Sequence, residues 1–173
     1  MPEGVWEDAR IGVALRGRHA GRIIVPVLAD TGEWMGWVGR AWGKSTLPYL
    51  YSRGMRRGEL LYNQSSMLVD TDEPVAVVEG VFDCYPTWPD SAAMLGKPST
   101  PSRPSPGQFE ALLASRRPLA VVLDGDSWMQ GKALSMRLRA HGQRAGFVRL
   151  PPQRDPDEVP VEWLRSEMRR CVG

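Results

Sequence analysis

Three short apolar runs in the second half of the chain predict strands of a buried parallel sheet. They are Val75–Val78, Leu119–Leu123 and Ala145–Leu150, and β-branched residues are frequent in them. Runs of this kind are typical of strands that are covered on both faces, because both sides of such a strand must be apolar. We therefore expect the three runs to lie side by side in one sheet.

Helical patterns alternate with these runs. Gln108–Ser115 and Ser127–Ala140 carry apolar residues at spacings of three and four, and Val161–Cys171 shows the same pattern at the end of the chain. Ser91–Leu95 is a further candidate strand, and the Pro- and Ser-rich segment Lys97–Gly107 predicts a loop. Strands that alternate with helices indicate an α/β fold.

The first half of the chain has a different pattern. Arg22–Ala29 and Glu33–Val38 read as strands joined by the turn Asp30–Gly32, which predicts a β-hairpin. We therefore divide the chain into a small β-rich N-terminal lobe, residues 1–73, and an α/β domain, residues 74–173. Positive charge is concentrated within the lobe, at Arg40, Lys44, Arg53, Arg56 and Arg57.

Composition narrows the class of protein. Apolar residues make up 42% and charged residues 24% of the 173 residues, and the net charge is +2, so we expect a soluble globular protein rather than a nucleic-acid coat. No apolar run is long enough to cross a bilayer, so no membrane partner is expected. Cys84, Cys171, His19 and His141 do not form a zinc-binding pattern, and without a signal peptide the thiols indicate a reduced, cytoplasmic protein.

Acidic residues follow each of the three predicted strands. Because the carboxyl ends of parallel strands meet at one edge of a sheet, we expect these side chains to converge. Like charges that converge repel one another unless cations neutralise them, and hard oxygen ligands suit Mg²⁺ or Mn²⁺. The six candidate ligands are Glu79, Asp83, Asp124, Asp126, Asp155 and Asp157.

Each acidic group also has a structural interpretation. Asp124-Gly125-Asp126 alone is as consistent with a tight turn as with a ligand set. Asp155 could cap the final helix, and Glu79 and Asp83 could complement a helix dipole. The order of the three groups, each after a buried strand, favours a metal site.

These residues resemble a known family. Val77–Asp83, Val121–Asp126 and Asp155–Asp157 are similar to the three acidic motifs of the Toprim domain in DnaG-type bacterial and phage primases. The resemblance extends upstream, so that it covers residues 10 to 160, through Gly21–Val27, Val38–Arg40, Tyr49-Leu50 and Arg57–Tyr62. It implies a Toprim-type parallel sheet flanked by helices.

The resemblance also implies an activity, the synthesis of short primers on a single-stranded DNA template from nucleoside triphosphates by metal-dependent nucleotidyl transfer. In this interpretation all six acidic residues bind metal, and Glu79, Asp124 and Asp126 are catalytic as well. Arg40 and Arg57 take the basic roles toward nucleotide and template, and charge and placement add Lys44, Arg53 and Lys132. A helicase and a separate zinc-binding protein are the further partners expected.

Two departures from the family leave alternatives open. Leu47–Leu50 lacks the family's lysine, and Ser127–Lys132 replaces a basic residue and Ala-Gly, as in divergent phage or plasmid forms. A Toprim nuclease and a non-catalytic replication accessory protein that binds nucleic acid are therefore alternatives. Five aromatic residues of the lobe could stack on single-stranded bases, but for most of them we expect core packing: Trp34, Trp37, Trp42, Tyr49 and Tyr51.

Overall fold

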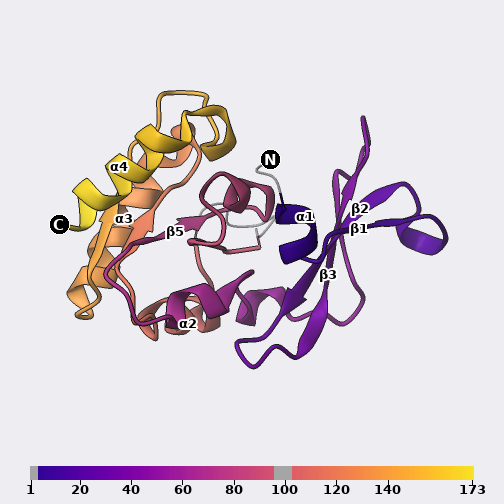
Figure 1. Ribbon diagram of the computed structural model, residues 1–173, viewed down its shortest axis with the longest axis horizontal. Helices are drawn as coiled ribbons and strands as arrows, with labels where there is room; N and C mark the ends of the chain where they lie inside the picture. The colour runs from indigo at the N-terminus through magenta and orange to yellow at the C-terminus, as the bar shows by residue number, and fades with distance from the viewer. Residues whose placement is uncertain (1–3, 96–102) are drawn as a thin grey trace. The chain divides into compact units, whose positions relative to one another are not determined.

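The computed structural model describes residues 4–95 and 103–173 (Figure 1). The chain forms two compact units, Met1–Arg56 and Arg57–Gly173. The first unit is built on an antiparallel sheet, and the second has a parallel sheet with helices on its faces. The predicted α/β fold with a β-rich N-terminal lobe is confirmed.

Four strands make up the sheet of the first unit, in the order β1-β2-β3-β4. The predicted hairpin is its centre, since β2 pairs with β3 from Arg22 opposite Ala41 to Leu28 opposite Trp34, with a bulge between Val27 and Leu28. The elements of this unit are α1 (Val5–Asp8), β1 (Gly12–Ala14), the 3₁₀ helix η1 (Gly17–His19), β2 (Arg22–Leu28), β3 (Trp34–Ala41) and β4 (Tyr49–Tyr51).

Two of the five aromatic side chains singled out in the first unit are exposed. Trp34 is 54% and Trp42 is 74% exposed, so neither packs in the core, whereas Trp37, Tyr49 and Tyr51 are half-buried. Trp34 begins β3 beside the hairpin turn, and Trp42 follows the last residue of β3, so neither lies in the paired middle of the strand. Trp37 is half-buried and contacts the His19 ring edge-on, with 5.7 Å between ring centroids.

The second unit holds a four-stranded parallel sheet in the order β6-β5-β7-β8. Its strands lie where the apolar runs predict them, although β7 and β8 end two and three residues earlier than those runs. The regular elements are β5 (Val75–Val78), β6 (Ser91–Ala93), α2 (Pro106–Leu113), β7 (Leu119–Val121), α3 (Trp128–Ala140), β8 (Ala145–Phe147) and α4 (Val161–Val172). Short 3₁₀ helices link them: η2 (Arg57–Glu59), η3 (Gln64–Leu68), η4 (Phe82–Thr87), η5 (Gly125–Ser127) and η6 (Pro156–Glu158).

Helix α2 begins inside the segment predicted as a loop. Part of Lys97–Gly107, residues 97–102, lies outside the described residues, and the helix starts at Pro106. Ser105 caps it through a capping box with Gln108, whose side-chain Oε1 accepts from the Ser105 backbone N–H at 3.0 Å. Proline at the first helical position needs no hydrogen-bond partner for its nitrogen, so Pro106 favours this start.

Alternate residues of the parallel sheet face different helices. Val75, Val77 and Val121 pack in one apolar core with Phe109 of α2 and Leu134 of α3. On the other face α4 lies so close to β8 that a side chain at Gly146 would overlap the carbonyl oxygen of Cys171. The sheet is therefore covered on both sides, as its apolar strands require. None of the described helices combines the length and the apolar character that a membrane span needs.

Residues 57–73, which the sequence places in the N-terminal lobe, pack with the second unit. The Tyr62 backbone forms an antiparallel bridge with Ala93 of β6, through hydrogen bonds of 2.9 and 3.1 Å. Leu61 and Met67 are fully buried in the core under the sheet. This segment therefore completes one edge of the α/β unit.

Candidate metal centre

The strand order of the second unit creates a switch point between β5 and β7. The chain leaves β5 toward β6 on one side and leaves β7 toward β8 on the other, although β5 and β7 are hydrogen-bonded neighbours. Crevices that bind ligands form at such points, beyond the carboxyl ends of the strands. Glu79 is the first residue after β5, and Asp124 follows β7 by three residues. Two of the predicted carboxylates thus leave the sheet at adjacent strand ends.

Asp83 lies in the first turn of η4, just after Glu79 and Gly80. Its Oδ2 accepts the Gly80 backbone N–H at 2.8 Å, which fixes the carboxyl group at the strand end. Burial nevertheless raises the pKa of Asp83 to about 7; the Gly80 hydrogen bond opposes this shift, and the charges of Asp124, Asp157 and Asp155 add to it. Asp83 therefore stabilises its own turn through the Gly80 hydrogen bond, and its carboxyl group is also influenced by the charges of the other two acidic groups.

The turn Asp124-Gly125-Asp126 is packed against the loop that precedes the third acidic group. The Gly125 N–H donates to the carbonyl oxygen of Arg154 at 2.8 Å, and the Gln153 N–H donates to Asp126 Oδ1 at 3.4 Å. Gly125 is buried, and a Cβ at this position would overlap the carbonyl oxygen of Pro151. The close approach of two backbones explains why glycine stands between the two aspartates.

We expect Gly125→Ala to destabilise the second unit by about 1–3 kcal/mol, because backbone rather than a flexible side chain must move to accept the methyl group. Urea denaturation measures this loss. Gly131→Ala is the matched control within the same segment, since its Cβ would lie 3.6 Å from Leu123, an ordinary contact, inside α3. The control should be neutral or stabilising by up to about 1 kcal/mol. Equal stability of the two variants would contradict the proposed packing of the turn.

Asp155 caps its own short turn and not the final helix. It forms a capping box with Glu158 at η6, in which the Asp155 N–H donates to the Glu158 carboxylate at 3.2 Å. The N-cap position of α4 is occupied by Pro160, which makes no side-chain capping hydrogen bond. Desolvation, followed by the charges of Glu158, Asp157 and Asp126, raises the pKa of Asp155. These local hydrogen bonds fix the conformation of the third acidic group within its own turn.

The carboxylates influence one another electrostatically across all three groups. The pKa of Asp124 is raised to about 7, first by burial and then by the charges of Glu79, Asp155 and Asp157. Among the described residues, however, no three acidic, His or Cys side chains lie close enough together to enclose a metal ion. Mg²⁺ usually binds through one or two carboxylates together with waters and phosphate oxygens. The six-residue metal site therefore stays a prediction.

The predicted basic residues are divided between the two units. Arg40, Lys44 and Arg53 belong to the first unit, and Arg57 and Lys132 belong to the second. The Arg40 guanidinium lies over the Tyr49 ring, 4.6 Å from its centroid. The Arg57 carbonyl oxygen accepts from Gln108 Nε2 at 2.9 Å, and Lys132 is exposed on α3.

Arg149 is a candidate that the sequence analysis missed. Its guanidinium lies over the ring of Trp128, 4.6 Å from the centroid, and Trp128 begins α3 two residues after Asp126. Arg149 follows β8 at the same edge of the sheet from which the acidic groups emerge. The sequence carries one signal for it, because Arg149 is a charged residue within the apolar run Ala145–Leu150. Its stacking on Trp128 can be seen only in the structure.

Comparison with known proteins is informative at the level of structure. No family model matches the chain, and no curated protein matches its sequence. The Aquifex aeolicus primase, in a crystal structure of its zinc-binding and RNA polymerase domains, superposes with a TM-score of 0.72 at 22% identity, over 90% of this chain and 41% of that one. The fold is that of a DnaG-type primase catalytic core. At 22% identity, this similarity shows that the two proteins share a fold and nothing more.

Two further structures share the primase core fold. A DnaG primase catalytic domain bound to single-stranded DNA gives a TM-score of 0.68 at 21% identity, over 97% of this chain and 58% of that one. The primase fragment of the bacteriophage T7 primase-helicase protein gives a TM-score of 0.67 at 12% identity, over 98% of this chain and 70% of that one. The chain thus spans less than two thirds of the first two structures.

Proposed function

We propose that this chain is the catalytic core of a DnaG-like primase, which synthesises short primers on single-stranded DNA from nucleoside triphosphates. The observation that carries the proposal is the placement of Glu79 and Asp124 beyond the adjacent strands β5 and β7, with Gln153 and Arg154, just before Asp155, hydrogen-bonded to the Asp124–Asp126 turn. A fold shared with primase cores supports it. The acidic motifs, with the helices around them, would then be a Toprim-type site.

The acidic side chains would hold Mg²⁺ or Mn²⁺, with Glu79, Asp124 and Asp126 nearest the reacting groups. A divalent cation bound there supplies charge neutralisation and orientation of the triphosphate during nucleotidyl transfer. The raised pKa values of Asp83 and Asp124 mean that, without a cation, these two groups hold protons near neutral pH. Arg57, Lys132 and Arg149 are the side chains of this unit that we propose contact phosphates.

The first unit would bind the template. Its basic residues Arg40, Lys44 and Arg53 provide charge, and exposed Trp34 and Trp42 provide surfaces on which unpaired bases can stack. One of the structures with this fold is bound to single-stranded DNA. This supports the template as a partner.

Further partners are suggested by the structures that share this fold. The Aquifex aeolicus structure includes a zinc-binding domain, and the T7 fragment belongs to a primase-helicase protein. We propose that a zinc-binding module and a helicase act together with this chain. The likeness to the T7 fragment also supports a relationship to phage-type primases.

A primer assay tests the proposal. The protein is incubated with single-stranded template, labelled nucleoside triphosphates and Mg²⁺ or Mn²⁺, with and without a zinc-binding module and helicase from a related primase system. We expect short labelled oligomers that require the template and the cation. Shortening of the template would instead indicate a nuclease, and binding of template without either product would indicate an accessory protein.

A further inference from the structure

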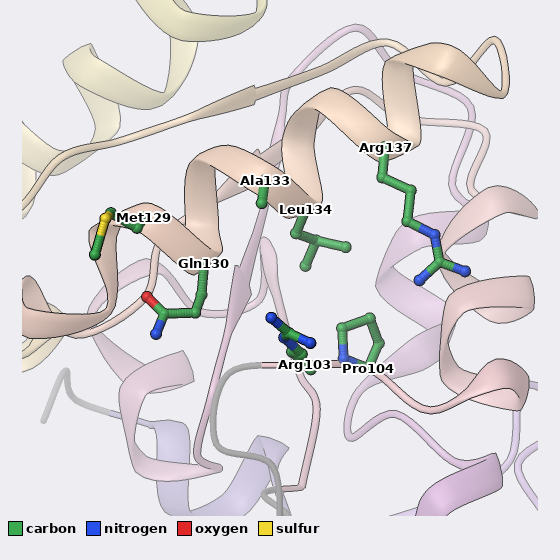
Figure 2. A pocket seen from close by; sticks show the side chains of 7 residues that line it. All are labelled: Arg103, Pro104, Met129, Gln130, Ala133, Leu134 and Arg137. Carbon is green, nitrogen blue, oxygen red and sulfur yellow. The ribbon is translucent and has the colours of Figure 1, made fainter.

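The second unit has a pocket that none of the six acidic residues lines. It has a volume of about 460 Å³ and lies along α3, beside the residues that precede α2 (Figure 2). A volume of this size is typical of sites for small molecules. Among the described residues, those that line it are Arg103, Pro104, Met129, Gln130, Ala133, Leu134 and Arg137.

The pocket is positively charged. Arg103 and Arg137 line it, and its other described lining residues are uncharged. Within the described part of the chain neither guanidinium forms an ion pair. The Arg137 guanidinium is stacked on the Phe109 ring, 3.7 Å from its centroid, which orients this cation while its N–H groups stay available.

The remaining lining suits a ligand with a ring as well as a charge. Figure 2 shows Gln130, Leu134 and Arg137 leaving α3 on the side of the helix that faces Arg103 and Pro104. Pro104 and Leu134 offer apolar contact between the two arginines. Gln130 Oε1 is buried and has no hydrogen-bond partner among the described residues, so a donor brought by a ligand would satisfy an acceptor that is otherwise unpaired.

We propose that this pocket binds a nucleoside phosphate at a second site, separate from the acidic edge of the sheet. The phosphate lies between Arg103 and Arg137, where planar guanidinium groups donate paired hydrogen bonds to its oxygens. The base packs on Pro104 and Leu134, and one of its N–H groups donates to Gln130. No acidic side chain takes part, so binding needs no divalent cation and does not depend on primer synthesis.

Calorimetric titration of the full chain with adenosine monophosphate in excess EDTA tests the site, since EDTA removes any contribution of metal at the acidic residues. We expect binding by the wild type. Arg137→Gln should weaken it by roughly tenfold or more through loss of a charge-assisted phosphate contact. Arg139→Gln is the matched control, because it removes the same charge from the same helix outside the pocket.

Two further variants test whether the binding takes place in this pocket or at the acidic residues. Ala133→Phe fills the pocket from an exposed helical position, keeps both arginines, and should abolish binding. Asp124→Asn should leave the affinity unchanged. The proposal is overturned if the wild type does not bind, if adenosine without phosphate binds equally well, or if Asp124→Asn alone abolishes binding while Arg137→Gln and Ala133→Phe do not.

Discussion

Replacing Asp124 and Asp126 together with asparagine is expected to reduce primer synthesis by at least about 100-fold, while the protein remains folded. Asparagine keeps the shape of the turn and the acceptor that Gln153 uses, but it removes both negative charges. The same change relieves repulsion, because the charges of Glu79, Asp155 and Asp157 already disfavour the ionised form of Asp124. In EDTA at pH 8 the double variant should therefore melt at a higher temperature than the wild type.

Loss of activity together with a higher melting temperature indicates a functional site, because replacing residues with a purely structural role would lower the melting temperature. A control variant with Glu110→Gln and Glu162→Gln changes the net charge by the same amount at exposed positions on α2 and α4. It should alter neither primer yield nor melting temperature by much. Primer synthesis that persists in the Asp124, Asp126 double variant would show that these residues are not catalytic.

The stability of the metal-free protein is expected to fall as the pH rises from about 4 to about 7. The pKa values of Asp83 and Asp124 are near 7 in the folded protein, against an ordinary value of 3.8. Between these values the folded state holds protons that the unfolded chain has released, so each rise in pH lowers the free energy of unfolding. Thermal melts in EDTA at a series of pH values measure this slope.

Addition of Mn²⁺ should restore the lost stability at pH 8 and have little effect at pH 5, where protons compete with the cation for the same oxygens. The variant with Asp83→Asn and Asp124→Asn should show a flatter pH profile and a smaller response to Mn²⁺. A melting temperature that rises between pH 5 and pH 7, or a slope that this variant leaves unchanged, would exclude the two aspartates as its source.

Local pattern was sufficient to predict most of the regular structure. The β5 run Val75–Val78 matches its strand exactly, and the predicted start of α4 at Val161 is also correct. The strand carries a strong signal because it is a continuous apolar run, as burial on both faces requires, and the helix because its apolar positions repeat at helical spacing. The placement of Glu79 and Asp124 beyond neighbouring parallel strands also followed from sequence, since parallel strands place their carboxyl ends together, whereas the gathering of all six carboxylates around a metal stays a prediction.

Other features depend on contacts between distant segments. The packing of Gly125 against Pro151 and the pocket between Arg103 and Arg137 join residues that are far apart in the sequence. The exposure of Trp42 reflects where β3 ends, and the apolar character of tryptophan alone suggests burial. Sequence pattern reports which face of an element is apolar, but it does not report which neighbour covers that face.

The bridge between Tyr62 and Ala93 sets a limit on how this protein can be divided by engineering. An expression fragment that begins at residue 74 would keep all six acidic side chains yet leave the Ala93 N–H and carbonyl groups without their partners. It would also remove Leu61 and Met67 and leave a gap beneath β5 and β6. A minimal acidic module, for use as a metal-binding reagent or for fusion to another domain, should therefore begin no later than Arg57.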